Sequence, residues 1–155
     1  MSTMPIIHRE TVLKDWIDYN GHMNEGYYPV VFSHAADELM AMIGVTPDYI
    51  RSTKLTFFTV ESHIRFLKEV KLGDPLTVRL QVLGVREKKL HLWYCMSLGD
   101  DGPEVATLES MWLFYDGKAG TVGPIVAEVR RLIDEMVDAQ GDLPTPDGAG
   151  RQIVL

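Results

Sequence analysis

The sequence predicts an α+β domain in which an antiparallel sheet surrounds one long, buried helix. Between Tyr28 and Gly44, apolar residues recur at steps of three and four, which is the spacing of a helix that is buried over much of its surface. From Thr56 to Tyr115, polar and apolar residues alternate in segments that are separated by turn sequences, as in successive antiparallel strands. One apolar helix followed by a run of strands favours a sheet folded around that helix.

The boundaries of the helix and of the first long strand follow from the same patterns. Pro29 stands near the start of the helix and Gly44 at its end, which are the positions these residues favour. The strand is expected from Thr56 to Val70. Strict alternation places Phe58, Val60, Ser62, Ile64 and Phe66 on one face of it, and Thr59, Glu61, His63 and Arg65 on the other.

Three further strands and a second helix complete the domain. The strands are expected over Leu76 to Arg86, Leu90 to Leu98 and Glu104 to Tyr115, with turns at 72–75, 87–89 and 99–103. An amphipathic helix should run from about Ile125 to Ala139. We therefore expect one domain over residues 1–140 and a loosely ordered tail over 141–155, which is rich in Gly, Pro and Asp.

Composition excludes several classes of function. The chain has 155 residues, of which 46% are hydrophobic, enough for one domain with its own core. Its net charge of -7 argues against nucleic-acid and anionic-membrane partners. Neither a membrane-spanning run nor a signal-peptide pattern is visible, and Cys95 has no partner for an internal disulfide. We expect a cytoplasmic protein.

The run from Asp18 to Tyr28 concentrates polar and aromatic groups just before the long helix. Asp18 provides a carboxylate that can attack a carbonyl or activate water. The N–H groups around Asn24, Glu25, Gly26 and Tyr27, at the positive end of the helix dipole, can stabilise an oxyanion. These groups together suit acyl transfer.

A purely structural interpretation explains the same residues. Asp18 and Asn24 are residue types that commonly form turns and cap helices. His22 either orients Asp18, which we favour, or binds a substrate carbonyl, or bonds only the local backbone. Asp15 is a rival acid three residues earlier, expected on the first strand or at its end. Spacing alone favours the structural interpretation.

A family resemblance reverses that balance. The signature Asp18-x-x-Gly21-His22-x-Asn24, followed by Tyr27-Tyr28, resembles that of hotdog-fold thioesterases of the 4-hydroxybenzoyl-CoA thioesterase-like branch. The segments 16–25, 59–63, 82–84 and 89–91 most resemble the betainyl-CoA thioesterases of carnitine breakdown. The similarity covers about residues 12–116, and the chain departs from the pattern at 53–55 and 92–94.

The resemblance implies a homo-oligomeric acyl-CoA thioesterase, a homodimer or a dimer of dimers, that needs no cofactor and no metal. Asp18 would be the base or nucleophile, with His22, Asn24, Glu25 and Gly26 completing the catalytic loop. The expected substrate-binding residues are Trp16, Tyr19, Tyr27, Glu61, His63 and Trp112. The resemblance also suggests that the face carrying Glu61 and His63 meets the Asp18 loop of a partner subunit.

The acyl group is expected to be short and to carry a quaternary ammonium, which aromatic faces attract through cation–π contacts. Trp16, Tyr19 and Trp112 are the candidates for that wall, with Glu61 as a counter-charge. The alternatives are an aromatic or medium-chain acyl-CoA and a non-catalytic acyl-CoA-binding module. A metal site of Asp18, His22, Glu61 and His63 is less favoured, because these residues show no compact ligand spacing.

Overall fold

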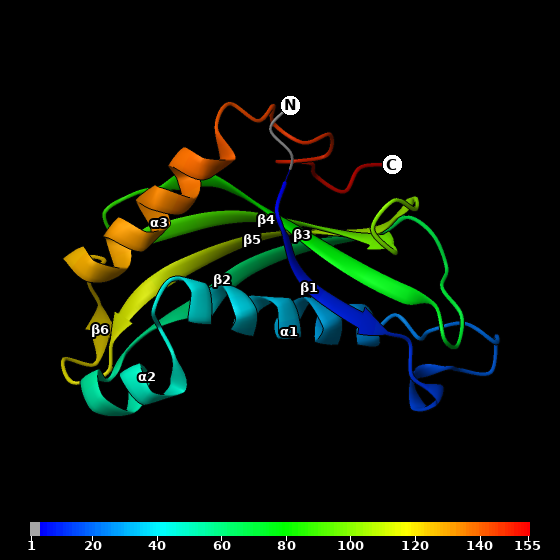
Figure 1. Cartoon of the computed structure of the whole chain (residues 1–155), viewed down its shortest axis with the longest axis horizontal. Helices are drawn as coiled ribbons and strands as arrows, with labels where there is room; N and C mark the ends of the chain where they lie inside the picture. Colours follow the sequence, from blue (N-terminus) through cyan, green and yellow to red (C-terminus); the bar gives the residue numbers. More distant parts are fainter. Residues whose placement is uncertain (1–3) are drawn as a thin grey trace.

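The computed structural model describes residues 4–155 and contains a curved antiparallel sheet with helices around it (Figure 1). The elements in chain order are β1 (Ile6–Thr11), η1 (Lys14–Trp16), α1 (Tyr27–Met42), α2 (Pro47–Thr53), β2 (Leu55–Phe66), β3 (Pro75–Val85), β4 (Lys89–Leu98), β5 (Glu104–Asp116), β6 (Thr121–Val122) and α3 (Ala127–Gln140). The strands follow the order β1-β3-β4-β5-β2, every pairing is antiparallel, and β6 pairs with β5. The predicted fold class is confirmed.

The core lies between α1 and the concave face of the sheet, which bends around the helix (Figure 1). Val31, Phe32, Ala35 and Leu39 follow one another at helical steps and are all buried, so this stripe of α1 faces the sheet. Tyr94 of β4 meets Phe32 edge-on, with ring centroids 6.1 Å apart, a separation usual for aromatic pairs. No helix within residues 4–155 is long and apolar enough to cross a membrane.

A β-bulge in β2 changes the face assignment that strict alternation predicts. The register against β5 shifts between Thr59 and Glu61. Phe57 is therefore buried beside Phe114, whereas Phe58 stacks against Tyr115 on the convex side and is 51% exposed. The prediction that Phe58 shares a face with Ser62 and Ile64 is wrong, because one extra residue inverts the order of the side chains before it.

Other boundaries also differ from the sequence prediction. The first long strand ends at Phe66, because the main-chain N–H groups of Leu67 and Lys68 both turn to the carbonyl of Val105. Asp15 lies in the short helix η1 and not on the first strand. The helix α2 was not predicted, although Thr46 caps it through its hydroxyl, which accepts from the N–H of Tyr49.

The chain after α3 lies across the convex face of the sheet (Figure 1). Gln81 of β3 donates to the carbonyl of Pro144, and the N–H of Gly150 donates to Glu109 of β5 at 2.7 Å. These bonds place the tail over β3, β4 and β5. The expectation that this tail is loosely ordered stays a prediction.

Candidate active site

The loop that carries Asp18 is a tight turn fastened at both ends. The N–H of Asp18 donates to the carbonyl of His22, and the N–H of Gly21 donates to the carbonyl of Asp18, each at 3.0 Å. Gly21 has φ of +77°, a left-handed conformation that favours glycine. Ile17 and Met23 form a β-bridge below the turn, and the N–H of Met23 donates to Val70. The turn is thereby held against the rest of the fold.

The Asp18 carboxylate is half-buried and is fixed by two donors. The N–H of Asn20 donates to Oδ1 at 2.8 Å, and Nδ2 of Asn24 donates to Oδ2 at 3.3 Å. Oδ1 of Asn24 in turn accepts from the N–H of Gly26 at 2.9 Å, so one amide links the acid to the start of α1. The structure brings Asp18, Asn24 and Gly26 together as expected, and their catalytic roles stay predictions. The same bonds are also expected if Asp18 and Asn24 serve only to form a turn and to cap the helix.

The predicted oxyanion donors are not equally available. The N–H of Gly26 bonds Asn24 Oδ1, the N–H of Tyr27 bonds the Asn24 carbonyl, and the N–H of Asn24 bonds the Trp16 carbonyl. Within residues 4–155, the N–H of Glu25 has no acceptor. Glu25, which is exposed, is therefore the main-chain donor of this set that is free to meet a ligand.

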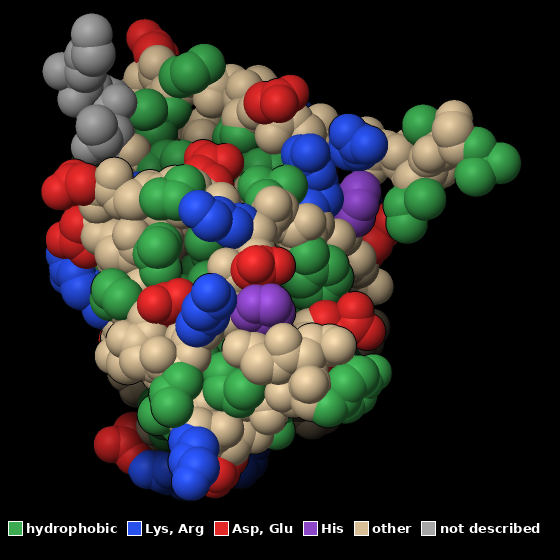
Figure 2. Space-filling view, turned by 90° about the vertical axis from the view of Figure 1, so that its right-hand side faces the viewer, with side chains coloured by type: hydrophobic (Ala, Val, Ile, Leu, Met, Phe, Trp, Pro, Cys, Tyr) green, Lys and Arg blue, Asp and Glu red, His purple; other side chains and the backbone are tan. Residues whose placement is uncertain are grey.

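The His22 side chain points to a different acid than predicted. Its Nε2 lies 3.5 Å from Oε1 of Glu69, while the contact with Asp18 runs through the His22 carbonyl. The orienting contribution of His22 in this structure comes from its main chain. Figure 2 views the molecule from the end at which α1 begins, and there Lys and Arg side chains are scattered among Asp and Glu.

The predicted aromatic wall is divided. Trp16 and Tyr27 stack beside the loop, with ring centroids 5.5 Å apart and planes at 17°, so one face of Trp16 is already covered. Tyr19 is 97% exposed. Trp112 instead lines a cavity between α1 and the edge strand β2. The expectation that Trp16, Tyr19 and Trp112 form one wall is wrong within a single chain.

That cavity has a volume of about 240 Å³ and is aromatic on its inner side. Phe32, Tyr94 and Trp112 line it together with small polar residues such as Ser110. The Tyr94 hydroxyl is buried and has no hydrogen-bond partner among residues 4–155, and burial raises its pKa. Sequence reasoning missed Tyr94 and Phe32, because in the sequence they read as ordinary core residues. A buried hydroxyl without a partner is the position at which a ligand or water is normally found.

Glu61 and His63 lie on the opposite side of the sheet from that cavity. They line a hollow on the convex face with His91, Glu109 and the tail residues 150–152. Glu61 therefore does not lie beside Trp112 as a counter-charge, because the bulge at 59–61 turns it away from α1. The predicted contact of this face with a partner's Asp18 loop stays a prediction.

The less favoured metal set of Asp18, His22, Glu61 and His63 does not come together. In the described part of the chain, the group of His and acidic side chains that is compact enough to hold an ion consists of His8, Glu10 and His34, which the sequence did not single out.

Comparison with known proteins places these features in a family. The profile of the Thioesterase-like superfamily matches residues 12–139. The chain is 37% identical over 155 residues to a betainyl-CoA thioesterase of Pseudomonas aeruginosa, covering 100% of this chain and 98% of the relative. It is 40% identical over 138 residues to an L-carnitine dehydrogenase/betainyl-CoA thioesterase of Rhizobium meliloti, of whose length it spans 28%.

Solved structures agree with this. A hypothetical protein of Staphylococcus aureus in complex with CoA superposes with a TM-score of 0.92 at 25% identity, covering 98% of this chain and 96% of that chain. A putative thioesterase of Pseudomonas putida KT2440 superposes with a TM-score of 0.84 at 33% identity, covering 99% of this chain and 97% of that chain. The hotdog fold and the resemblance drawn from the Asp18 signature are confirmed.

Proposed function

Because the chain belongs to the thioesterase-like superfamily, we propose that it is an acyl-CoA thioesterase that hydrolyses betainyl-CoA to betaine and CoA. The observation that carries the proposal is the joint position of a fixed carboxylate and a free main-chain donor. Asp18 and the N–H of Glu25 lie at the two ends of a short turn linked by Asn24. Thioester hydrolysis requires these two groups, an acid–base or nucleophile and an oxyanion donor.

The reaction follows from these positions. With Asp18 as base, the carboxylate takes a proton from water while the water oxygen bonds to the thioester carbonyl carbon. The carbonyl oxygen becomes an oxyanion that the Glu25 N–H stabilises. When the carbonyl re-forms, the carbon–sulfur bond breaks, and the CoA thiolate receives the proton from Asp18. With Asp18 as nucleophile, the carboxylate bonds to the carbonyl carbon and the carbon–sulfur bond breaks, which gives a mixed anhydride and CoA thiolate. Water then cleaves the anhydride to the free acid and Asp18, and one proton of that water ends on the CoA thiolate. Neither route uses a metal or a further cofactor.

The cavity that contains Trp112 suits the acyl group. Trimethylammonium is a fixed cation without a proton to donate, so aromatic faces are favourable partners for it. Phe32, Tyr94 and Trp112 supply such faces in one cavity. The relative of 37% identity supports this choice of substrate, since betainyl-CoA is the compound that its name states.

We place the active enzyme in a homo-oligomer in the cytoplasm. The cavity lies against β2, whose outer edge has no strand beside it within residues 4–155, so a second subunit there would complete its wall. Cys95 is a free buried thiol, which suits a reducing compartment.

A substrate pair tests the proposal. Betainyl-CoA and 3,3-dimethylbutyryl-CoA have acyl groups of the same shape, and only the first carries a charge. We expect kcat/KM for betainyl-CoA to be at least ~10-fold higher, equivalent to ~1.4 kcal/mol of transition-state binding. Equal values would reject the ammonium pocket and leave a thioesterase for uncharged, aromatic or medium-chain acyl groups. Absence of turnover across a panel of acyl-CoA esters would favour a binding module.

A further inference from the structure

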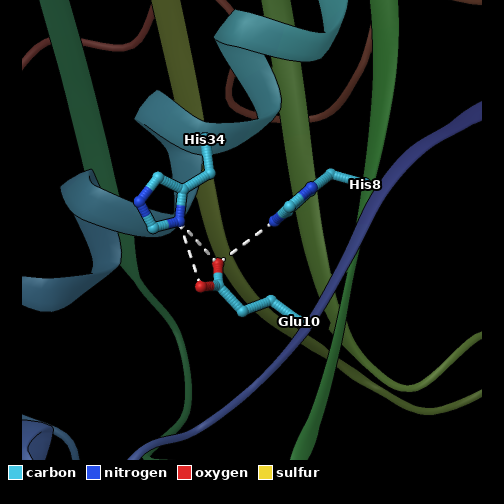
Figure 3. A group of neighbouring side chains, drawn as sticks. All are labelled: His8, Glu10 and His34. Atoms are coloured by element: carbon cyan, nitrogen blue, oxygen red, sulfur yellow. Dashed lines mark hydrogen bonds and ion pairs between the residues drawn. The ribbon is translucent and has the colours of Figure 1, made fainter.

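Three side chains from two distant parts of the sequence meet at the seam between β1 and α1. His8 and Glu10 stand two residues apart on β1, so both point to the same side of the strand, and His34 reaches them from α1 (Figure 3). Both imidazoles contact one carboxylate. His34 Nδ1 lies 2.9 and 3.0 Å from the two Glu10 oxygens, and His8 Nε2 lies 3.1 Å from Oε2.

The separations between these atoms suit a small divalent ion. The three ligand atoms all lie within 4.8 Å of one another. Two ligands at roughly 2.0–2.1 Å from a tetrahedral zinc ion are roughly 3.3 Å apart. The Glu10 oxygens lie 2.9–3.1 Å from the two histidine nitrogens, so these pairs need shifts of only a few tenths of an ångström. The two histidine nitrogens lie within 4.8 Å of each other and would have to approach by at most about 1.5 Å. The two imidazole rings approach the carboxylate from different directions, since their centroids are 6.0 Å apart and their planes are inclined at 66° to each other.

The chemistry of the three groups selects among metals. Two imidazoles and one carboxylate favour zinc and neighbouring first-row ions over magnesium and calcium, which prefer oxygen ligands. The His34 side chain is 43% exposed, whereas His8 and Glu10 are 16% and 18% exposed, so the group is sheltered on one side and open to solvent on the other. Water can complete the coordination from the open side. In the described part of the chain, Glu10 has no Lys or Arg partner, and its side-chain hydrogen bonds are with these histidines alone.

We propose that His8, Glu10 and His34 form a binding site for one divalent transition-metal ion, with zinc the best match. The site is separate from the Asp18 loop and independent of the proposed hydrolysis. Its effect is structural, because β1 is an edge strand that pairs only with β3 among the described strands. An ion shared by β1 and α1 would tie that edge to the central helix.

Metal titration of the tag-free, EDTA-treated full chain tests the site. We expect one Zn²⁺ per chain by calorimetry and a rise in Tm of about 5–10 °C at a free concentration one hundred times the Kd. Co²⁺ should give the visible absorption of a tetrahedral complex. Absence of all three signals would mean that the residues form a hydrogen-bonded cluster only, and would overturn the proposal.

Matched variants locate the ion. His34→Gln and Glu10→Gln should each weaken Zn²⁺ binding by more than about tenfold, since even loss of a group behind a metal ligand costs that much. His91→Gln is the control, because His91 also contacts a carboxylate, Glu109 at 2.7 Å, but in the described part of the chain this pair belongs to no compact group of three ligands. It should bind Zn²⁺ as the unchanged chain does. If Glu10→Gln does not fold, His34→Gln, which changes a partly exposed residue of α1, still tests whether the ion binds at this site. Binding that survives in His34→Gln or is lost in His91→Gln would place the ion elsewhere.

Discussion

At the scale of single residues, the carboxylate of Asp18 is the group on which the proposed chemistry depends. Asp18→Asn keeps the size of the side chain and one of the two hydrogen bonds that its oxygens accept, but leaves neither base nor nucleophile. We expect kcat to fall by far more than tenfold with little change in the circular dichroism spectrum, because the lost interaction belongs to the chemical step.

The control for this measurement is Asp15→Asn. Asp15 is the rival acid, and it lies exposed in η1, outside the turn that holds Asp18. It should retain wild-type kcat. If Asp18→Asn kept more than about a tenth of kcat, a loss of no more than ~1.4 kcal/mol in the barrier, another residue would be the catalytic acid.

Cys95 is predicted to be an unreactive side chain, in contrast to Asp18. The thiol is 3% exposed, and burial, together with a hydrogen bond to Glu104, raises the pKa of Cys95 from 9.0 to about 12. At pH 8 its thiolate fraction should thus be about a thousandfold below that of an ordinary thiol. We expect a disulfide reagent to react with the native chain at least about a hundredfold more slowly than with the guanidinium-unfolded chain. Comparable rates would show that the thiol is accessible.

At the scale of elements, periodicity predicted what is regular and failed at single-residue irregularities. The helix over 28–44 and the four long strands after it could be predicted because each carries many residues of one pattern. The bulge at 59–61 could not, since nothing in the alternation shows an inserted residue, and it reversed the face of Phe58. The same shift turns Glu61 away from the cavity that contains Trp112, whereas its expected role as a counter-charge rested on the charge of the ligand and not on the alternation. The candidate site was more predictable, because Asp18, Asn24 and Gly26 are neighbours in sequence, whereas His8 and His34 meet only through the tertiary fold.

Gln140 shows how one side chain can substitute for a strand. The β1 strand begins at Ile6, and past this end of β1 the main chain of Val82 in β3 pairs with the Gln140 amide instead. The Val82 N–H donates to Oε1, and Nε2 donates to the Val82 carbonyl, each at 2.9 Å. Both groups are buried. Gln140→Ala would leave the N–H and the C=O of Val82 without partners, so we expect a loss of about 1–3 kcal/mol in the free energy of unfolding.

Thermal unfolding measures that loss. A decrease in Tm of about 3–10 °C is expected for a chain of this length. Gln152→Ala removes the same side chain from an exposed position of the tail, where within residues 4–155 it makes no hydrogen bond to the main chain of a strand, and should leave Tm unchanged. An unchanged Tm in Gln140→Ala would mean that water replaces the amide.

At the scale of the whole molecule, the free edge of the sheet predicts assembly. β2 stands at the end of the strand order, and Phe58, Val60 and Phe66 along it are 51%, 54% and 47% exposed. Long exposed edges with apolar side chains join other strands unless they are covered. An isologous dimer through β2 would pair the two edges and place each cavity beside the partner.

Sedimentation velocity tests the dimer, with a charge placed on the edge to break it. At micromolar concentration we expect the unchanged chain to sediment without a folded monomer, and Val60→Lys to shift toward monomer, since a lysine on an edge strand opposes pairing. Leu72→Lys adds the same charge at an apolar residue that is 58% exposed in a turn away from β2, and should remain dimeric. If Val60→Lys is a folded monomer with wild-type kcat, the site is complete in one subunit. If the active site is shared across the interface, Val60→Lys should remain folded but lose kcat, whereas Leu72→Lys should keep both its fold and its kcat.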